Sequence, residues 1–417
     1  MSAETKAQAA RGERLFKYAQ VLMLSAAATF IYSAPYLRQQ FKSPLMEAFQ
    51  LTEAQLGNLS STYGIACMLC YLPGGWLADR VSPRRLVIAS LLAGAVTFIW
   101  MATIPGYSSL LVIYAAWGVI GILVMWSAML RQVRVIGDER EQGRLFGLLE
   151  GSRGLFEAAL FTLAALLFSW FTVQTAGMSA VFGLYALLSG GLGLWLLFGG
   201  EGGGADGAES AAIKLRDVLL IVREPTVLLM CVMLTAVFHL FWAIIEFPSF
   251  GERAGFGMTV AATLAIGTVR VWMRPVGGVL GGIVGDRVTN ARSVMWLLAL
   301  GGAICVFLAL MDTSPDSAWI LWALVVPFGV LVYAVRGLIW AVLQDCPIPT
   351  YLTGTAIGFI SIMGYSSDIY IPQVSSYLLG TYSDTAGYQL FFAYCAAAAL
   401  LGVGATWRLM RLRPRPE

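Results

Sequence analysis

Long apolar runs dominate this sequence and restrict its fold more than any other feature. A helix needs about 20 mostly apolar residues to cross the roughly 30 Å hydrocarbon core of a bilayer. Twelve such runs occur, at residues 15–37, 56–78, 86–104, 109–131, 145–169, 176–198, 226–250, 259–284, 291–311, 317–343, 352–379 and 386–408. The sequence therefore predicts an all-α integral membrane protein with twelve transmembrane helices.

The composition agrees with a membrane setting and excludes several other classes. Hydrophobic residues make up 58% of the 417 residues and charged residues only 12%, whereas a soluble protein carries about 25% charged residues. The net charge is +3, and no basic patch alternates with aromatic residues, which excludes nucleic acid as a partner. The six cysteines lie in or beside apolar runs, and His239 is the only histidine. We therefore expect packed thiols, no metal site and no cofactor.

The twelve runs fall into two sets of six, separated by a glycine-rich and acidic segment at 199–217. This segment has no apolar periodicity, which predicts a flexible cytoplasmic linker between one six-helix bundle at 1–198 and another at 218–417. With the N-terminus inside, 20 of the 27 basic residues fall on the cytoplasmic side and three on the other. Because basic residues favour the cytoplasmic side, both termini are predicted to be cytoplasmic.

A repeat relates the two halves. Residues 74–85 read GGWLADRVSPRR and residues 281–292 read GGIVGDRVTNAR, at an offset of 207. A weaker echo joins GRLFG at 143–147 to GTAIG at 354–358. Duplicated six-span halves are typical of secondary transporters, which bind their substrate near the interface of the repeats.

The first of these motifs resembles the loop 2–3 signature of the major facilitator superfamily, although Ser82 stands where that family usually has glycine. The resemblance implies a monomeric transporter whose two bundles rock about a central substrate site. It also implies a charged cytoplasmic latch between the halves, for which a plain positive loop is the alternative. The candidate latch residues are Gly74, Asp79, Arg80, Arg84, Arg131, Arg134, Asp286, Arg287 and Arg336.

Ionisable residues inside the spans are the strongest functional signal, because each costs at least about 2.5–3.5 kcal/mol at the bilayer centre. Glu150, Arg153 and Glu157 are spaced by three and four residues and so share one helix face. We expect Arg153 to bind an anion and the glutamates to carry a proton; an ion pair within the helix is the alternative. The offset of 211 pairs Glu157 with Asp368, a further candidate proton carrier.

Arg270 and Arg274 share a face of the span at 259–284, directly before Pro275. A guanidinium matches the geometry of carboxylate and phosphate groups, so we expect both arginines to bind an anionic substrate. The alternative is that they bond to Asp368, Glu246 or backbone carbonyls.

Three further residues within spans are candidate substrate contacts: Tyr32, Tyr365 and His239, which lies mid-span. The offset of 207 pairs His239 with Tyr32. A neutral histidine also packs well in a core, so a purely structural role of His239 is the alternative.

The predicted function is secondary transport of a small organic anion, as a symporter with protons or as an antiporter that exchanges anions, in a bacterial inner membrane. No ATP-binding G-x-x-x-x-G-K-[ST] motif occurs in the sequence. Segments such as MLRQVR and GYSSDIYIPQ resemble the bacterial sugar-phosphate and organic-anion branch of the family. Tyr32 and His239 replace the arginines of organophosphate antiporters, so phosphate-ester specificity is not expected. A drug or amphipathic-cation exporter and a transport-inactive sensor are the alternatives, whereas no nucleophile–base pair suggests an enzyme.

Overall fold

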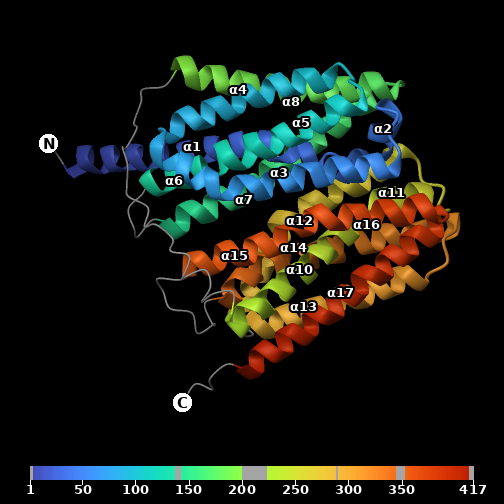
Figure 1. Ribbon diagram of the computed structural model, residues 1–417. Coiled ribbons are helices and arrows are strands. Elements are labelled where there is room, and N and C mark those ends of the chain that lie inside the picture. The colour runs from blue at the N-terminus through green and yellow to red at the C-terminus, as the bar shows by residue number, and fades with distance from the viewer. Residues whose placement is uncertain (1–2, 137–141, 200–222, 288–289, 344–352, 413–417) are drawn as a thin grey trace. The chain divides into compact units, whose positions relative to one another are not determined.

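The computed structural model describes residues 3–136, 142–199, 223–287, 290–343 and 353–412, and its regular secondary structure within these ranges is entirely helical (Figure 1). The first part of the chain forms α1 (Ala3–Ser33), η1 (Ala34–Tyr36), α2 (Arg38–Ala48), α3 (Glu53–Arg80), α4 (Pro83–Ala102), α5 (Tyr107–Gly118), η2 (Val119–Trp126), α6 (Ser127–Ile136), α7 (Gln142–Ser169) and α8 (Gln174–Gly199). The second part forms α10 (Pro225–Ile245), α11 (Phe247–Arg253), α12 (Val260–Arg287), α13 (Asn290–Leu310), η3 (Pro315–Ser317), α14 (Ala318–Leu343), α15 (Thr353–Tyr365), α16 (Ser367–Thr381) and α17 (Asp384–Leu412).

Nearly all described residues of the twelve predicted runs lie on helices. Among the described residues, nine helical stretches are long and apolar enough to cross a membrane. The other three runs lie on α3, on α12 and on the pair α15–α16. Helices α3 and α12 have 28 residues each, which corresponds to about 42 Å at 1.5 Å per residue and suffices for a crossing. The all-α prediction is thus confirmed. Some runs are divided between elements. These include the fourth, divided among α5, η2 and α6, the seventh, divided between α10 and α11, and the eleventh, divided between α15 and α16, which meet at Ser366.

Proline sets the start of two helices. Pro83 is the first residue of α4 and Pro225 the first residue of α10, a position where the missing N–H costs no hydrogen bond. Ser82, the residue that departs from the family motif, has φ −53° and ψ 127°. This extended conformation is the one that a following proline favours, so Ser82 fits the turn between α3 and α4.

The structure divides into two compact units, each of which has its own packing. The first comprises Met1–Leu37 and Leu69–Ser210. Within it α4 packs along α8 and α1 along α7. Serine hydroxyls join α1 to α7: Ser152 Oγ donates to Ser25 Oγ at 2.7 Å, and Ser25 Oγ lies 3.2 Å from the Leu149 carbonyl. Small polar residues of this kind hold membrane helices together at close range.

The second unit comprises Arg38–Met68 and Ala211–Glu417. Within it α12 packs along α14, and α17 packs along both α10 and α13. Helix α10 is the most enclosed of these helices, since nearly every residue from Met230 to Ile245 is buried. Helix α2 and the first half of α3 belong to this unit, so the unit does not follow chain order. The predicted bundles 1–198 and 218–417 stay a prediction, and nearly all of the predicted linker lies outside the described residues.

Candidate functional site

In the first unit, the structure brings together three of the predicted site residues around the Arg153 guanidinium. Its Nη1 donates to Glu150 Oε1 at 2.6 Å. The guanidinium carbon lies 5.4 Å from the centroid of the Tyr32 ring and 5.7 Å from that of Trp126. The Arg153 side chain is 13% exposed and that of Glu150 is 53% exposed. The cation is therefore largely covered by aromatic faces, whereas its carboxylate partner is open to the surroundings.

A π-helical segment shapes this site. Residues Val119–Trp126 form η2, in which the wider turns replace the α-helical pattern in the middle of the span. The Tyr32 hydroxyl donates to the Gly121 carbonyl at 2.6 Å. A Cβ at Gly121 would lie 3.1 Å from Tyr32 Cε1, so a glycine suits this close approach of the ring. π-Helical segments are rare and occur frequently at functional sites.

The backbone around Arg153 is held against α1. Thr29 Oγ1 lies 3.5 Å from the Arg153 carbonyl oxygen, one turn beyond the serine contacts between α1 and α7. Glu157, the third member of the predicted face, is half-buried one turn further along α7. The spacing argument thus placed Glu150 and Arg153 correctly on one face. The ion pair within the helix, which was the alternative, is present, and anion binding by Arg153 stays a prediction.

In the second unit, Arg270 is fully buried on α12, and its Nη2 donates to Gln39 Oε1 on α2 at 3.0 Å. Arg274 lies one turn later and is half-buried. Asp368 is buried in the first turn of α16, where its Oδ1 accepts a hydrogen bond from Trp242 Nε1 at 3.0 Å. Gln39 was not among the partners that the sequence suggested for Arg270. This contact depends on the packing of α2 against α12, which the local sequence does not indicate.

His239 is buried on α10 with both ring nitrogens in contact. Its Nδ1 lies 2.8 Å from the Thr235 carbonyl oxygen and its Nε2 lies 2.9 Å from the Tyr394 hydroxyl. Because a carbonyl only accepts, Nδ1 carries a proton, and in the neutral ring Nε2 accepts from Tyr394. This arrangement suits the packed, neutral alternative. Tyr365 contacts Phe238 edge-to-face at 5.2 Å, and substrate contact by His239 or Tyr365 stays a prediction.

The predicted latch residues have separate local roles where their side chains are described. Arg84 Nη2 donates to the Leu196 carbonyl at 2.6 Å and so caps the last turn of α8. Arg336 lies over the Phe241 ring at 4.1 Å and over Phe238 at 5.3 Å. Gly74 faces η2: a Cβ there would be 2.9 Å from the Ile122 carbonyl oxygen.

Two further candidate latch residues lie on α3 and α6. Arg80 is exposed at the end of α3, and Arg131 is half-buried on α6. The side chains of Asp79, Arg134, Asp286 and Arg287 lie outside the described part of the structure. A latch formed by these residues stays a prediction.

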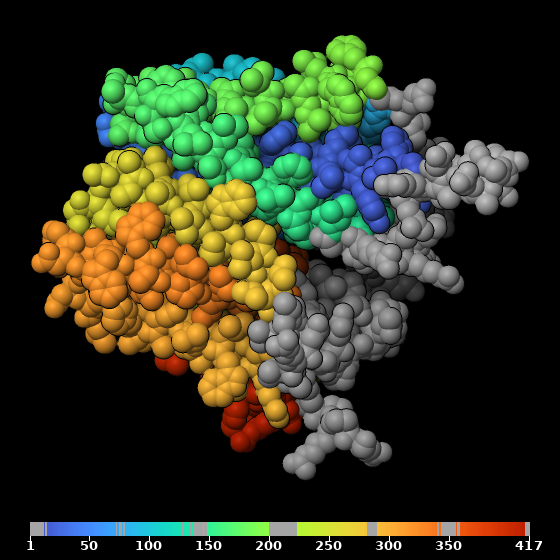
Figure 2. Space-filling model, turned by 180° about the vertical axis from the view of Figure 1, so that it is seen from behind, coloured from blue at the N-terminus to red at the C-terminus, as the bar shows by residue number. Residues whose placement is uncertain are grey.

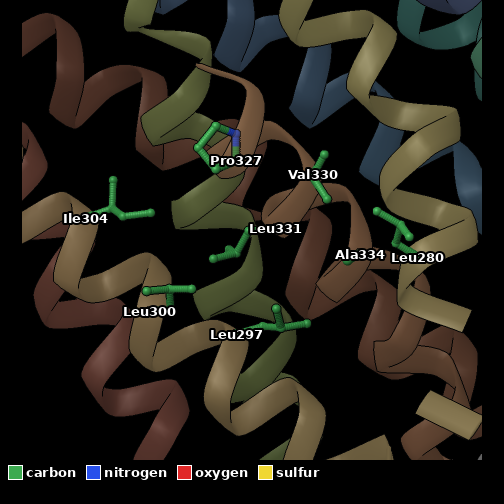
Figure 3. Close-up of a pocket in the computed structure, with 8 residues that line it drawn as sticks. All are labelled: Leu280, Leu297, Leu300, Ile304, Pro327, Val330, Leu331 and Ala334. Atoms are coloured by element: carbon green, nitrogen blue, oxygen red, sulfur yellow. The ribbon is translucent and has the colours of Figure 1, made fainter. Parts of the chain in front are cut away.

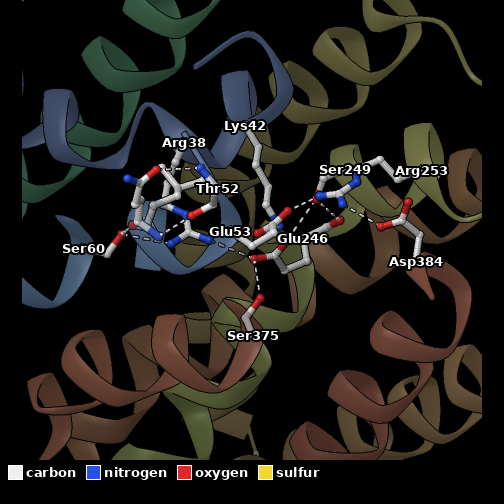
Figure 4. A network of polar contacts seen from close by, with 12 residues as sticks. Arg38, Lys42, Thr52, Glu53, Ser60, Glu246, Ser249, Arg253, Ser375 and Asp384 are labelled. Carbon is white, nitrogen blue, oxygen red and sulfur yellow. Dashed lines mark hydrogen bonds and ion pairs between the residues drawn. The ribbon is translucent and has the colours of Figure 1, made fainter. Parts of the chain in front are cut away.

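A largely buried ionic network in the second unit joins α2 and α3 to Glu246 at the junction of α10 and α11, and to α11, α16 and α17 (Figure 4). None of its residues is a site candidate from the sequence. Glu246 is its centre, with Oε2 2.9 Å from Lys42 Nζ and Oε1 3.3 Å from Arg38 Nη2. Ser249 and Ser375 also donate to this carboxylate, at 2.9 and 3.1 Å. We call this set, with Glu53, Arg253 and Asp384, the outer ionic network.

The remaining members extend this network. Glu53 accepts from Arg253 and lies 3.4 Å from Lys42 Nζ, and Arg253 also bonds to Asp384 at 2.6 Å. Burial lowers the pKa of Lys42, but the Glu246 and Glu53 carboxylates outweigh this effect and raise its pKa above the ordinary value. Burial likewise raises the pKa of Glu53, but Lys42 and Arg253 outweigh it and lower its pKa. Both groups therefore stay charged around neutral pH.

Comparison with known proteins identifies the family. The profile of the Major Facilitator Superfamily matches residues 19–372. The inner membrane protein YqcE of Escherichia coli (strain K12) is 26% identical over 378 residues, which cover 88% of each chain. A D-galactonate transporter of Escherichia coli O6:H1 (strain CFT073) is 22% identical over 387 residues, covering 86% of this chain and 87% of that protein.

The fold agrees with this match. The crystal structure of a D-xylose–proton symporter superimposes with a TM-score of 0.72 at 14% identity, covering 96% of this chain and 98% of that chain. The family profile covers most of the chain, including the loop motif at 74–85 and the face that carries Arg153. The chain therefore belongs to the major facilitator superfamily and is a membrane transporter of that family.

Proposed function

We propose that this protein carries a small organic carboxylate together with a proton, and that Arg153 is the group that binds the carboxylate. The observation that carries the proposal is the Arg153 guanidinium held over Tyr32 and Trp126, with the half-exposed Glu150 carboxylate as an ion-pair partner. An arginine keeps its charge in a protein, so this position always presents a cation. A carboxylate substrate has the same chemistry as the Glu150 side chain that the arginine already binds.

Competition between substrate and Glu150 gives the coupling. Glu150 is half-exposed at its side chain, so a solute carboxylate and a proton both have access to it. When Glu150 is protonated it no longer competes for the Arg153 charge, and the anion takes its place. Proton and anion therefore bind cooperatively, and by linkage each increases the affinity of the other.

This exchange fixes the charge carried per cycle. In the resting site Arg153 and Glu150 sum to zero, and in the loaded site Arg153 and a monovalent anion sum to zero beside a neutral Glu150. Transport of one monovalent anion with one proton is then electroneutral. The relative named as a D-galactonate transporter supports a sugar acid or similar carboxylate as the solute class.

The other predicted residues keep proposed roles. Arg270, Arg274, Tyr365 and His239 are further substrate contacts, and Glu157 and Asp368 are further proton carriers. The name of the relative YqcE supports a bacterial inner membrane, and the distribution of basic residues supports cytoplasmic termini. The cytoplasmic latch and a monomeric carrier complete the proposal.

Uptake into proteoliposomes tests this function. We expect an inward proton gradient to drive accumulation of labelled D-galactonate, and a membrane potential alone to leave uptake of this monovalent acid unchanged. Glu150→Gln should retain binding but lose acceleration by the proton gradient. Uptake of a cationic dye instead of the acid would favour an exporter of amphipathic cations. Binding of the acid without any flux would indicate a sensor, and either result would overturn the proposal.

A further inference from the structure

An apolar groove runs along the surface of α12, α13 and α14 and encloses about 350 Å³. Figure 3 shows Leu280 on one side, Leu297, Leu300 and Ile304 on the other, and residues of α14 between them. The groove is lined by Leu280, Leu297, Leu300, Ile304, Pro327, Val330, Leu331 and Ala334. Leu280 is 43% exposed and Leu300 is 56% exposed, so the groove opens to the exterior of the second unit.

Close packing of α12 on α14 creates the groove. A Cβ at Gly277 would lie 2.6 Å from the Val330 carbonyl oxygen, and one at Gly281 would lie 2.8 Å from the Ala334 carbonyl oxygen. This four-residue glycine spacing lets the two backbones approach closely. Helix α13 packs against α17 and α14 and much less against α12. The face of α14 between α12 and α13 therefore forms the floor of the groove, in which Leu331 is 4% and Ala334 5% exposed.

The chemistry of the groove selects a lipid chain as its occupant. Both α13 and the stretch Pro315–Ile339 are long and apolar enough to span a membrane, and the surface that they present is seen in orange in Figure 2. An apolar surface open to the bilayer is covered by acyl chains, because hydrocarbon is the solvent at that depth.

A positive charge lies on α13 ahead of the residues of this helix that line the groove. Arg292 is exposed in the first turn of α13, and Trp296, 67% exposed, follows one turn later on the stripe that continues to Leu300. Tryptophan favours the membrane–water interface. At 1.5 Å per residue, Leu297 and Ile304 lie about 7.5 and 18 Å along α13 from Arg292. A phosphate held at Arg292 thus places the acyl chain of the same lipid along the groove.

We infer that this groove and Arg292 together bind one anionic phospholipid, with an acyl chain against α14 and the headgroup phosphate at the Arg292 guanidinium. A guanidinium binds phosphate through paired N–H groups. One basic residue near the membrane surface gives an expected preference of about fivefold for an anionic over a zwitterionic lipid. This lipid site is independent of which solute the protein carries.

Native mass spectrometry of the full chain, purified in detergent and mixed with phosphatidylglycerol or phosphatidylcholine, tests the inference. We expect one tightly retained phosphatidylglycerol on the wild type. Val330→Phe fills the groove and should lower this retention at least tenfold, with Val326→Phe, at an exposed position of α14 that does not line the groove, as the control. Arg292→Gln should abolish the preference for phosphatidylglycerol, with Arg408→Gln, at an exposed arginine of α17, as the control.

The second pair of variants keeps the test independent of folding, because Arg292 and Arg408 are both exposed. Equal retention of both lipids by the wild type would overturn the inference. So would retention of phosphatidylglycerol by Arg292→Gln or Val330→Phe at the level of the matched control, since that result describes a general lipid coat.

Discussion

Two arginine–glutamate pairs in this transporter use the same chemistry in opposite ways. Glu150 pairs with Arg153, and its side chain is 53% exposed. Glu246 is 1% exposed and accepts from Arg38, Lys42, Ser249 and Ser375. A carboxylate with four donors and almost no exposure has no room for a competing anion, whereas a half-exposed carboxylate does. The access that the surroundings have to the carboxylate, and not the type of ion pair, thus determines whether a solute anion can replace it.

Glu246→Gln should have the largest effect on stability, because it removes the buried member of the two carboxylates. Removing this charge leaves Lys42 and Arg38 buried with less compensation, and the loss of one partner of a buried pair costs about 3–5 kcal/mol. Thermal unfolding in detergent should show a strongly lowered midpoint. The matched change Glu150→Gln removes an exposed partner and should cost less than about 1 kcal/mol. Equal midpoints for the two variants would show that the outer ionic network does not stabilise the fold.

Arg153→Gln should have the next largest effect. We expect a loss of substrate affinity on the order of 100-fold, because hydrogen bonds to charged groups contribute about 1.5–3 kcal/mol each. Arg153→Lys retains the charge but not the paired N–H groups, so it should recover only part of the affinity. Equilibrium binding of labelled D-galactonate measures both. An unchanged affinity in Arg153→Gln would remove Arg153 from the substrate site.

Thermal unfolding at a series of pH values tests the contribution of Glu53 to stability. Its lowered pKa means that its stabilising contribution is present above the unfolded value, about 4.3, and is lost as the pH falls through the folded pKa. The raised pKa of Lys42 gives a contribution that is present below about 10.4 and lost only at higher pH. The unfolding midpoint should thus change little through this network between about pH 5 and 10 and fall in acid. In Glu53→Gln the acid-side fall should be smaller than in the wild type.

Trp126→Leu should have the smallest effect. It removes one aromatic face from the Arg153 guanidinium but leaves the charge and Tyr32 in place. Cation–π contacts contribute about 0.5–2 kcal/mol, so the affinity for the anion should fall between about two- and thirtyfold. Trp195→Leu, at a 60% exposed position of α8, is the matched control. A loss as large as that of Arg153→Gln would mean that Trp126 supports the fold of the site as a whole.

The sequence predicted much of the fold and part of the site. The twelve runs, the helical class and the shared face of Glu150 and Arg153 follow from periodicity, which is a local property of the chain. The π-helical turns at 119–126 left no signal, because VIGILVMW is uniformly apolar and has no period. Trp126 was therefore missed as a partner of Arg153.

The outer ionic network was missed for a different reason. Arg38, Lys42 and Arg253 lie between runs, where charges are usually solvated, and nothing in their local sequence indicates burial. Glu246, the partner of Arg38 and Lys42, is about 200 residues from them in the chain. Only the packing of α2 and α3 within the second unit brings these charges together.

Proton uptake on anion binding tests the exchange at Arg153 most directly. Calorimetric titration of the purified protein with D-galactonate, in buffers of different ionisation enthalpy near neutral pH, gives the number of protons bound with each anion. The exchange of Glu150 for a substrate carboxylate predicts about one proton taken up per anion in the wild type and none in Glu150→Gln. Anion binding to the wild type without proton uptake, or the same uptake in Glu150→Gln, would contradict it.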